Sequence, residues 1–275
     1  MRGWIAALGL GPREHVAVVG GGGKTSLCFA LADELLASGN RVITTTTTKV
    51  WRKEAERAPC LVFSSSGSPA PNGLKEGLSK NGHVFVAQRQ LDNGKLEGIL
   101  PETADAFFRN FDVDYLIAEA DGAAGRPVKT PAAHEPVVPS SATLVIAVMG
   151  LEAVGTPLDS GVVFRTGLFK ELTGLEEGDA LTPSALAAVF QSPRGLFRGA
   201  PESARRIVFL NKSDLLSPDQ DGDDLARRLL RLPNGRIERV VMGSIVKRIC
   251  RVFTRQRQGI EIDCQSVSVD LILNS

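Results

Sequence analysis

The chain has 275 residues, which is enough for a buried core and fits one large α/β domain. Its 32 lysines and arginines nearly balance its 31 aspartates and glutamates, so no broad charge attracts nucleic acid or a membrane surface. No apolar run approaches the roughly 20 residues that cross a bilayer, and we expect no export signal at the N-terminus. The four cysteines are widely spaced and form no CxxC pair, which argues against a disulfide framework and a zinc knuckle: Cys28, Cys60, Cys250 and Cys264. We therefore expect a soluble cytoplasmic protein.

The first predicted unit is a strand, a glycine loop and a helix. The apolar run HVAVV at residues 15–19 is typical of a strand buried on both faces of a parallel sheet. From Lys24 the apolar residues recur at helical spacing, and Gly39 with Asn40 provides a helix stop. The β-branched run that follows predicts a parallel strand at residues 41–45, which would complete a right-handed βαβ unit before the remaining threonines leave the sheet.

Two segments after this unit are predicted to be insertions. Residues 64–73 are rich in Ser, Gly and Pro and indicate a surface connection. Residues 83–100 predict a β-hairpin that turns at Asn93 and Gly94.

Later segments alternate in the manner of an α/β protein. Apolar runs predict strands at 115–120, 143–149 and 206–210, with helices near 104–110, 183–190 and 225–232. We therefore predict a P-loop NTPase-like fold: a mainly parallel sheet flanked by helices, with a β-hairpin insertion. Residues 1–243 would form one nucleotide-binding domain, and residues 244–275 a C-terminal extension.

The strongest functional motif is GGGGKTS, which stands between the first strand and its helix. Glycines let the backbone turn so that N–H groups and the helix N-terminus meet phosphate oxygens. Lys24 would neutralise the β and γ phosphates, Thr25 would ligate Mg²⁺ and Ser26 would contact the α phosphate. Val18 stands where the common pattern has its first glycine, and a glycine-rich turn without a ligand is the alternative. The predicted nucleotide-binding residues of this loop are Gly20, Gly21, Gly22, Gly23, Lys24, Thr25 and Ser26.

The strand DYLIAEADG ends in two acids and a glycine. Glu119 and Asp121 would therefore lie where strand ends meet a ligand crevice, and we predict that one of them, with Thr25, serves Mg²⁺. The two acids share a face, so alternation does not choose between them. An ordinary surface strand end is the alternative.

A proline-rich segment follows this strand and carries four candidates for a switch or a substrate clamp: Arg126, Lys129, His134 and Glu135. Thr47 and Lys49 in the threonine run are further candidates beside the phosphates. A proline-rich surface crossover and a plain β-branched strand explain the same residues structurally.

Asn211-Lys212-Ser213-Asp214 follows the run at 206–210 and matches the N-K-x-D element of GTPases. A carboxylate accepts from the N1 and N2 hydrogens of guanine, whereas adenine lacks that donor pair. Asn and Asp are also common turn residues. We therefore expect GTP, with ATP as the alternative, to be recognised through Asn211, Lys212 and Asp214.

Together, VGGGGKTS, VITTTTTKVW, EADGAAGRPVKTPAAHEPVVP and FLNKSD resemble the YqeC family over about residues 8–243. The resemblance implies a cytoplasmic accessory role in making or inserting the cofactor of selenium-dependent molybdenum hydroxylases. It also implies functional roles for the residues that match the family motifs: Gly20 to Thr25, Glu119, Asp121, Lys129, His134 and Glu135.

Our hypothesis from the sequence is a Mg-dependent GTPase or NTPase with catalytic Lys24, Glu119 and Asp121, in which the nucleotide switches a loop at residues 122–139. One alternative is an ATP-dependent transferase or ligase that activates a small substrate. Another is a nucleotide-binding module without turnover.

Overall fold

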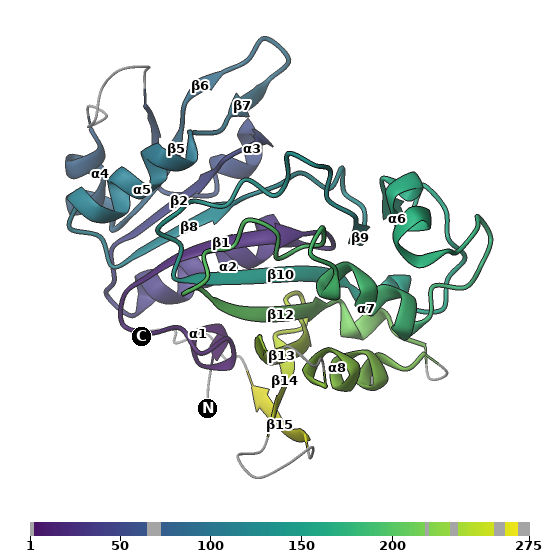
Figure 1. Cartoon of the computed structure of the whole chain (residues 1–275). Helices are drawn as coiled ribbons and strands as arrows, with labels where there is room; N and C mark the ends of the chain where they lie inside the picture. The colour runs from purple at the N-terminus through teal and green to yellow at the C-terminus, as the bar shows by residue number, and fades with distance from the viewer. Residues whose placement is uncertain (1–2, 65–72, 218–219, 232–235, 256–261, 269–275) are drawn as a thin grey trace.

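A computed structural model describes residues 3–64, 73–217, 220–231, 236–255 and 262–268. Within these residues, ten strands form one twisted sheet (Figure 1). Neighbouring strands are parallel from β13 to β4, and the other end of the sheet is antiparallel. Across the sheet the order is β15 (Ile262–Ser268), β14 (Ile249–Arg255), β13 (Ile237–Ser244), β12 (Arg205–Asn211), β10 (Leu144–Gly150), β1 (Glu14–Gly20), β8 (Tyr115–Glu119), β2 (Val42–Thr46), β5 (His83–Ala87) and β4 (Leu61–Phe63).

Strand β1 lies in the interior of this sheet, between β8 and β10. All seven of its residues are buried, as the apolar run predicted. Parallel pairing places Val18 opposite Glu119 and Gly20 opposite Val148, so the loop after β1 and the ends of both neighbours lie at one edge. Strand β2 is parallel to β1 but is separated from it by β8, so the βαβ unit spans two strand positions.

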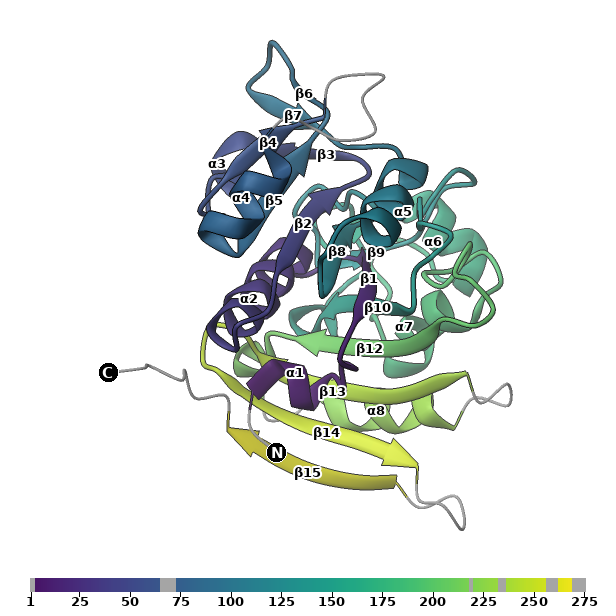
Figure 2. The same ribbon diagram turned by 90° about the vertical axis from the view of Figure 1, so that its left-hand side faces the viewer.

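Helices cover both faces of the sheet. Helices α1 and α2 pack on one face around Trp4, Val18 and Leu31, whereas α5, α7 and α8 pack on the other. Figure 2 shows α2 on one side of the strands and α5 and α7 on the opposite side. The helices are α1 (Gly3–Ala7), α2 (Lys24–Ala37), α3 (Arg52–Ala55), α4 (Leu74–Asn81), α5 (Pro101–Asn110), α6 (Thr166–Thr173), α7 (Pro183–Gln191) and α8 (Gly222–Leu230), with short 3-10 turns η1 (Leu151–Ala153) and η2 (Ser213–Leu215).

The predicted hairpin is present, but it begins later than the sequence suggested. Strands β6 (Arg89–Gln90) and β7 (Lys95–Glu97) are antiparallel around Asn93 and Gly94, and β7 also pairs with β3 (Lys49–Trp51). The preceding strand β5 belongs to the central sheet, where β2 and β4 pair with it in parallel. Assigning residues 83–87 to an insertion was therefore wrong, because their sheet partners are distant in sequence. A further two-strand pair joins β9 (Val128–Lys129) to β11 (Val163–Phe164).

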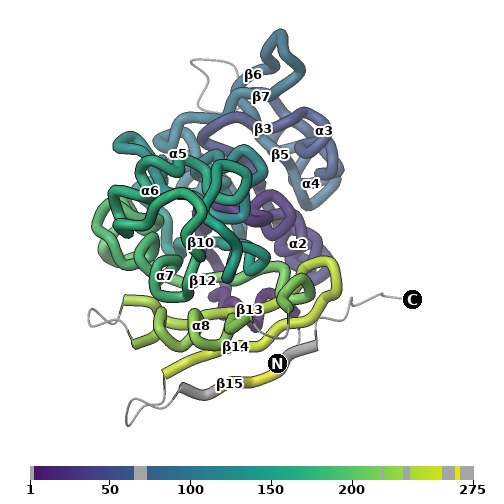
Figure 3. The backbone as a smooth tube through the Cα atoms, turned by 90° about the vertical axis from the view of Figure 1, so that its right-hand side faces the viewer, coloured from purple at the N-terminus to yellow at the C-terminus, as the bar shows by residue number. Residues whose placement is uncertain are grey.

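The C-terminal part of the chain continues the central sheet. The predicted boundary at Gly243 falls inside β13, and β14 and β15 extend the sheet by antiparallel pairing. Figure 3 shows these strands at the end of the molecule opposite β3, β6 and β7. Of the predicted connection at 64–73, residues 65–72 lie outside the described residues.

The architecture is thus mixed α/β, with a large, mostly parallel sheet flanked by helices, as predicted. It is consistent with a P-loop NTPase-like fold. Within the described part of the chain, no helix combines the length and apolar character needed to cross a membrane.

Candidate functional site

The loop between β1 and α2 requires glycine for its backbone shape. Gly20 has φ 99° and Gly22 has φ 74°, a region that L side chains rarely adopt. A Cβ at Gly20 would lie 2.2 Å from the Val148 carbonyl oxygen, and one at Gly22 would lie 2.2 Å from the Gly150 nitrogen. The neighbouring strand β10 therefore presses directly against the loop, which leaves no room for a side chain.

Three backbone N–H groups of this loop are used inside the protein. Gly20 donates to the Asp121 carboxylate, Gly21 to the Val148 carbonyl and Gly22 to the Arg126 carbonyl, at 2.9–3.1 Å. The first-turn N–H groups of α2 have no acceptor within the helix, and no side chain caps them. The part of the loop suited to an anion is therefore the start of α2, at Lys24, Thr25 and Ser26.

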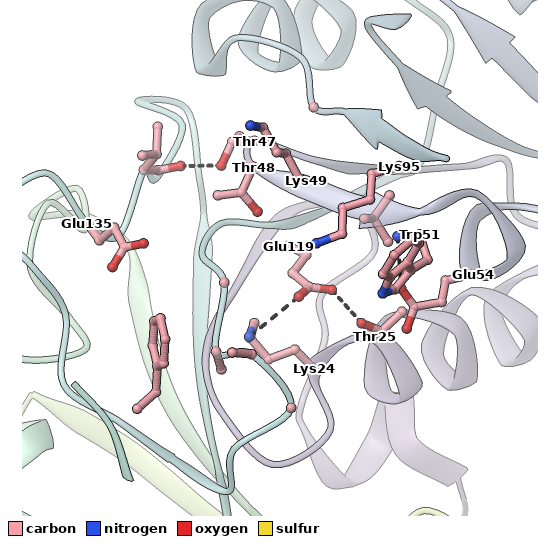
Figure 4. A pocket seen from close by; sticks show the side chains of 18 of the residues that line it. Lys24, Thr25, Thr47, Thr48, Lys49, Trp51, Glu54, Lys95, Glu119 and Glu135 are labelled. Atoms are coloured by element: carbon pink, nitrogen blue, oxygen red, sulfur yellow. Dashed lines mark hydrogen bonds and ion pairs between the residues drawn. The ribbon is translucent and has the colours of Figure 1, made fainter. Parts of the chain in front are cut away.

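Lys24 lies between the two acids that the sequence singled out. Its Nζ is 3.3 Å from an Asp121 oxygen and 3.5 Å from a Glu119 oxygen, and it donates to the Gly20 carbonyl at 2.7 Å. The Thr25 hydroxyl donates to the other Glu119 oxygen at 2.7 Å (Figure 4). The structure therefore brings Lys24, Thr25, Glu119 and Asp121 together at one strand end.

The ion pairs continue into the proline-rich segment. Lys129, whose side chain is fully buried, lies 3.1 Å from Asp121 and 2.9 Å from Glu135. It also donates to the Gly122 carbonyl at 2.5 Å. Glu135 in turn accepts from the guanidinium of Arg165. A chain of alternating charges thus runs from Lys24 through Asp121, Lys129 and Glu135 to Arg165.

These contacts shift the pKa values of several groups. Burial opposes the charge on Lys24, but the carboxylates of Asp121 and Glu119 outweigh it and raise the Lys24 pKa. Burial also raises the pKa of Glu119, with Lys24 and the Thr25 hydroxyl acting against that rise. Burial opposes charge at Glu135 too, yet Lys129 and Arg165 lower the Glu135 pKa overall. Lys24 and Glu135 are therefore held in their charged forms.

The start of α2 opens into a cavity of about 1170 Å³. Its walls come from the loop after β1, the ends of β2 and β8, the small sheet formed by β3 and β7, and the segments around residues 122–126, 134–137 and 164–165. Figure 4 shows side chains from these elements facing one another across it. The cavity-lining residues that the sequence predicted are Gly22, Gly23, Lys24, Thr25, Ser26, Thr47, Lys49, Glu119, Arg126, His134, Glu135 and Lys212.

The switch candidates occupy different positions in this cavity. Thr47 donates to the Val137 carbonyl at 3.0 Å, which ties the threonine run to the proline-rich segment. Arg126 donates to the Ser160 carbonyl at 2.7 Å. Lys49 and His134 are exposed at the cavity wall, whereas Lys129 is buried behind it.

Several residues that line the cavity have a strained backbone conformation. Among the described residues, non-glycine positions with positive φ include Ala124, Arg165 and Lys212, and each of them lines the cavity. Such conformations cost about 1–3 kcal/mol each and cluster at functional sites. The strain here supports a functional reading of the cavity.

The candidate base-reading residues lie at the end of β12, on the β10 side of β1, whereas Glu119 lies on the β8 side. The Asn211 amide donates to the Gly22 carbonyl at 2.8 Å and accepts from the Ile245 N–H at 3.3 Å, so it joins the glycine loop to the end of β13. Lys212 pairs with Glu152. Asp214 is exposed and lies outside the cavity lining. The N-K-x-D element is therefore anchored to the loop, and its acid faces solvent.

The oxygens of Thr25 and Glu119 suit a hard divalent cation. They already meet at 2.7 Å, and Mg²⁺ bound with a polyphosphate takes one or two protein oxygens. Asp121 is fully buried and is engaged with Gly20, Lys24 and Lys129, so direct ligation favours Glu119. Over the described residues no cluster of three or more His, Cys, Asp or Glu side chains suits a metal ion.

The structure adds residues that the sequence did not indicate. Trp51 and Lys95 come from the small sheet and line the cavity, and the Lys95 Nζ lies 4.7 Å from the centre of the Trp51 ring. Arg165 reaches Glu135 from a different segment. The turn at Asn93 and Gly94 predicted the hairpin that carries Lys95, but no local pattern placed that hairpin beside the glycine loop.

The glycine loop lies between two parallel strands, Lys24 and Thr25 open the next helix, and Glu119 stands at the adjacent strand end. This arrangement is consistent with an α/β protein of P-loop NTPase-like fold. A family model described as YqeC protein matches residues 16–167. The uncharacterized protein YqeC of Escherichia coli (strain K12) is 37% identical over 219 residues, which cover 76% of this chain and 83% of that protein. The chain belongs to the YqeC family.

Proposed function

We propose that this protein binds a Mg-nucleoside triphosphate at the start of α2, hydrolyses it slowly and uses the change to switch the segment at residues 122–139. We take GTP as the preferred nucleotide, with ATP as the alternative. The contact of Lys24 with both Glu119 and Asp121, beside a Thr25 hydroxyl that already meets Glu119, is the observation that carries the proposal.

The proposed roles follow from charge and position. Lys24 would exchange its carboxylate partners for the terminal phosphate oxygens, which carry the same sign of charge. The uncapped N–H groups of α2 would hold the remaining phosphate oxygens. Bound Mg²⁺ would supply positive charge that stabilises the phosphates, held by Thr25 and Glu119. No covalent nucleophile is needed, since positioning and electrostatics dominate phosphoryl transfer.

The switch follows from Asp121, which touches both parts of the site. It accepts from the Gly20 N–H in the glycine loop and pairs with Lys129 in the proline-rich segment. A change in the partners of Lys24 therefore alters the charge balance at Lys129 and Glu135. This link supports a coupling between phosphate binding and the segment at residues 122–139.

We further propose that the switched segment acts on a selenium-dependent molybdenum hydroxylase or on the machinery that makes its cofactor. This client comes from the family resemblance. Exposed His134 and the cavity wall around it are the part of the segment that would present a changed surface to such a partner.

The test is competitive binding of fluorescent GTP and ATP to the purified protein with Mg²⁺, followed by release of labelled γ phosphate. Lys24→Ala should weaken binding of either nucleotide by at least tenfold, because it removes a buried charge-assisted contact. Lys75→Ala, at an exposed position of α4, is the matched control and should bind as the wild type does.

Because Lys24 is buried, thermal unfolding of each variant must be measured beside binding. Folded wild-type protein that binds no nucleoside triphosphate in Mg²⁺ would contradict the proposal. Tight binding without phosphate release, with or without a client, would favour a binding module without turnover. Transfer of the labelled phosphate to a small molecule would favour a transferase.

A further inference from the structure

The cavity extends well beyond the position that a nucleotide would take. Nucleotide binding with the base near Asn211 would direct the base toward β12, on the β10 side of β1. The lining from that side includes Lys212, whereas most of the cavity lies toward β8, β2 and the small sheet. At about 1170 Å³ it also exceeds the 300–1,000 Å³ that is typical of a site for one small ligand.

The outer part of this cavity combines positive charge with an aromatic ring. Trp51 is 47% exposed, although large aromatic side chains usually bury most of their surface. Lys49 and Lys95 stand on the neighbouring strands β3 and β7, and Trp51 pairs with Lys95 across them. Leu100, 61% exposed, contributes apolar surface to the same wall.

The nearby carboxylates form no ion pair with these two lysines. Glu97 stands opposite Lys49 across β3 and β7 but pairs with Arg89 at 2.5 Å, and Glu54 accepts from the Trp51 backbone N–H at 3.1 Å. Throughout the described residues, neither Lys49 nor Lys95 has a carboxylate oxygen within 4.0 Å. Figure 4 shows Lys95 extending toward Glu119 from beside Trp51. Neither ammonium group is held in an ion pair, so both can contact an anion, although Glu54, Glu97 and Glu119 line the same cavity.

We propose that Lys49, Trp51, Lys95 and Leu100 form a second-ligand subsite for a planar aromatic molecule that carries an anionic group. The ring stacks on Trp51 and the anion lies between the lysines, next to the place where the terminal phosphate would bind. The placement beside the phosphate rests on the proposed nucleotide function. The aromatic and cationic character of the subsite rests on the cavity wall itself.

The test uses 8-anilinonaphthalene-1-sulfonate, an aromatic anion with a flat naphthalene ring system, whose emission rises in apolar surroundings and which accepts energy from tryptophan. N-phenyl-1-naphthylamine, the same rings without the sulfonate, is the control for charge. The chain has two tryptophans, so a Trp4→Phe background leaves Trp51 as the donor. Titration of this protein should give saturable energy transfer from Trp51 to the sulfonate and a clearly weaker response to the uncharged control.

Variants then locate the binding. Lys95→Ala should weaken sulfonate binding roughly threefold to tenfold, as expected for loss of one partly exposed cation beside a ring. Lys53→Ala is the matched control, since Lys53 is an exposed lysine two residues from Trp51 that does not line the cavity. It should leave the affinity unchanged.

The proposal is overturned if sulfonate binding is not saturable, if Lys95→Ala and Lys53→Ala behave alike, or if the uncharged control binds equally well. Mg-GTP should bind together with the sulfonate, and strict competition between them would instead make the subsite part of the nucleotide site. A protein that binds the sulfonate through Lys95 but no nucleotide would refute the proposed nucleotide function and leave the aromatic-anion subsite standing.

Discussion

Replacing Lys129 by methionine tests the buried charge chain most directly. Methionine keeps much of the length and apolar volume of the lysine stem but removes its charge. Lys129 is 1% exposed, and its Nζ lies 3.1 Å from Asp121 and 2.9 Å from Glu135, which are themselves 0% and 8% exposed. The substitution leaves two buried carboxylates with one fewer cation and frees the Gly122 carbonyl.

Removing one partner of a buried ion pair costs about 3–5 kcal/mol. Asp121 retains Lys24 and Glu135 retains Arg165. We therefore expect the free energy of unfolding to fall by the cost of one broken pair, although Lys129 contacts two carboxylates. For a domain of this size, such a loss lowers the melting temperature by about 10 °C. Urea unfolding followed by circular dichroism, together with calorimetry, measures both quantities.

Two further variants separate charge from packing. Lys170→Met removes an exposed ion pair with Glu176 and should leave the urea midpoint unchanged. Adding Glu135→Gln to Lys129→Met removes one of the two buried carboxylates that lost a cation and should recover part of the lost stability. An unchanged midpoint for Lys129→Met alone would refute the reasoning, because it would mean that the buried carboxylates do not depend on this cation.

The remaining predictions concern ligand choice and pH. Asp214→Ala should reduce a preference for GTP over ATP by about tenfold in competitive binding, through loss of a hydrogen bond to a charged acceptor; an unchanged preference would make the base assignment wrong. Thr25→Ala should weaken nucleotide binding in Mg²⁺ but not in EDTA, and equal weakening in both would argue against a metal role. Burial lowers the pKa of His83 to about 4 from the ordinary value of 6.5, so the unfolded chain takes up its proton first as pH falls. The stability that His83 contributes should therefore be full above pH 6.5 and fall by about 3 kcal/mol toward pH 4. Burial also lowers the pKa of His15 to about 4, so His83→Gln should make the decline in urea unfolding shallower without abolishing it, and an equally steep profile would contradict the prediction.

The sequence predicted those parts of the fold whose signals are local. The strand, glycine loop and helix from Glu14 to Ala37 follow from an apolar run, φ-permissive glycines and helical periodicity within one stretch. Strand β5 was misassigned because the turn at Asn93 and Gly94 dominates its neighbourhood, whereas its parallel partners β2 and β4 lie elsewhere in the sequence. The C-terminal strands were missed because polar residues interrupt their apolar pattern: β14 carries Arg251 and Arg255, and β15 carries Asp263, Gln265 and two serines.

The residues of the candidate site also fall into those with a local sequence signal and those placed only by tertiary contacts. Lys24, Thr25 and Glu119 were chosen because each follows a strand or opens a helix, and parallel strands bring those ends together. Arg165 meets Glu135 across 30 residues, and no spacing rule connects them. Trp51 and Lys95 depend on where the small sheet packs beside the glycine loop, which is a matter of tertiary contacts.

The double contact of Lys24 has a consequence for selectivity among anions. An inorganic phosphate or sulfate ion that approaches this ammonium group meets the negative charges of Glu119 and Asp121 at the same place. Repulsion from the two acids offsets the attraction of the lysine, so small free anions gain little by entering. A ligand that brings its own cation avoids this penalty, and the resting charge pattern thereby screens the site against the abundant salts of its surroundings.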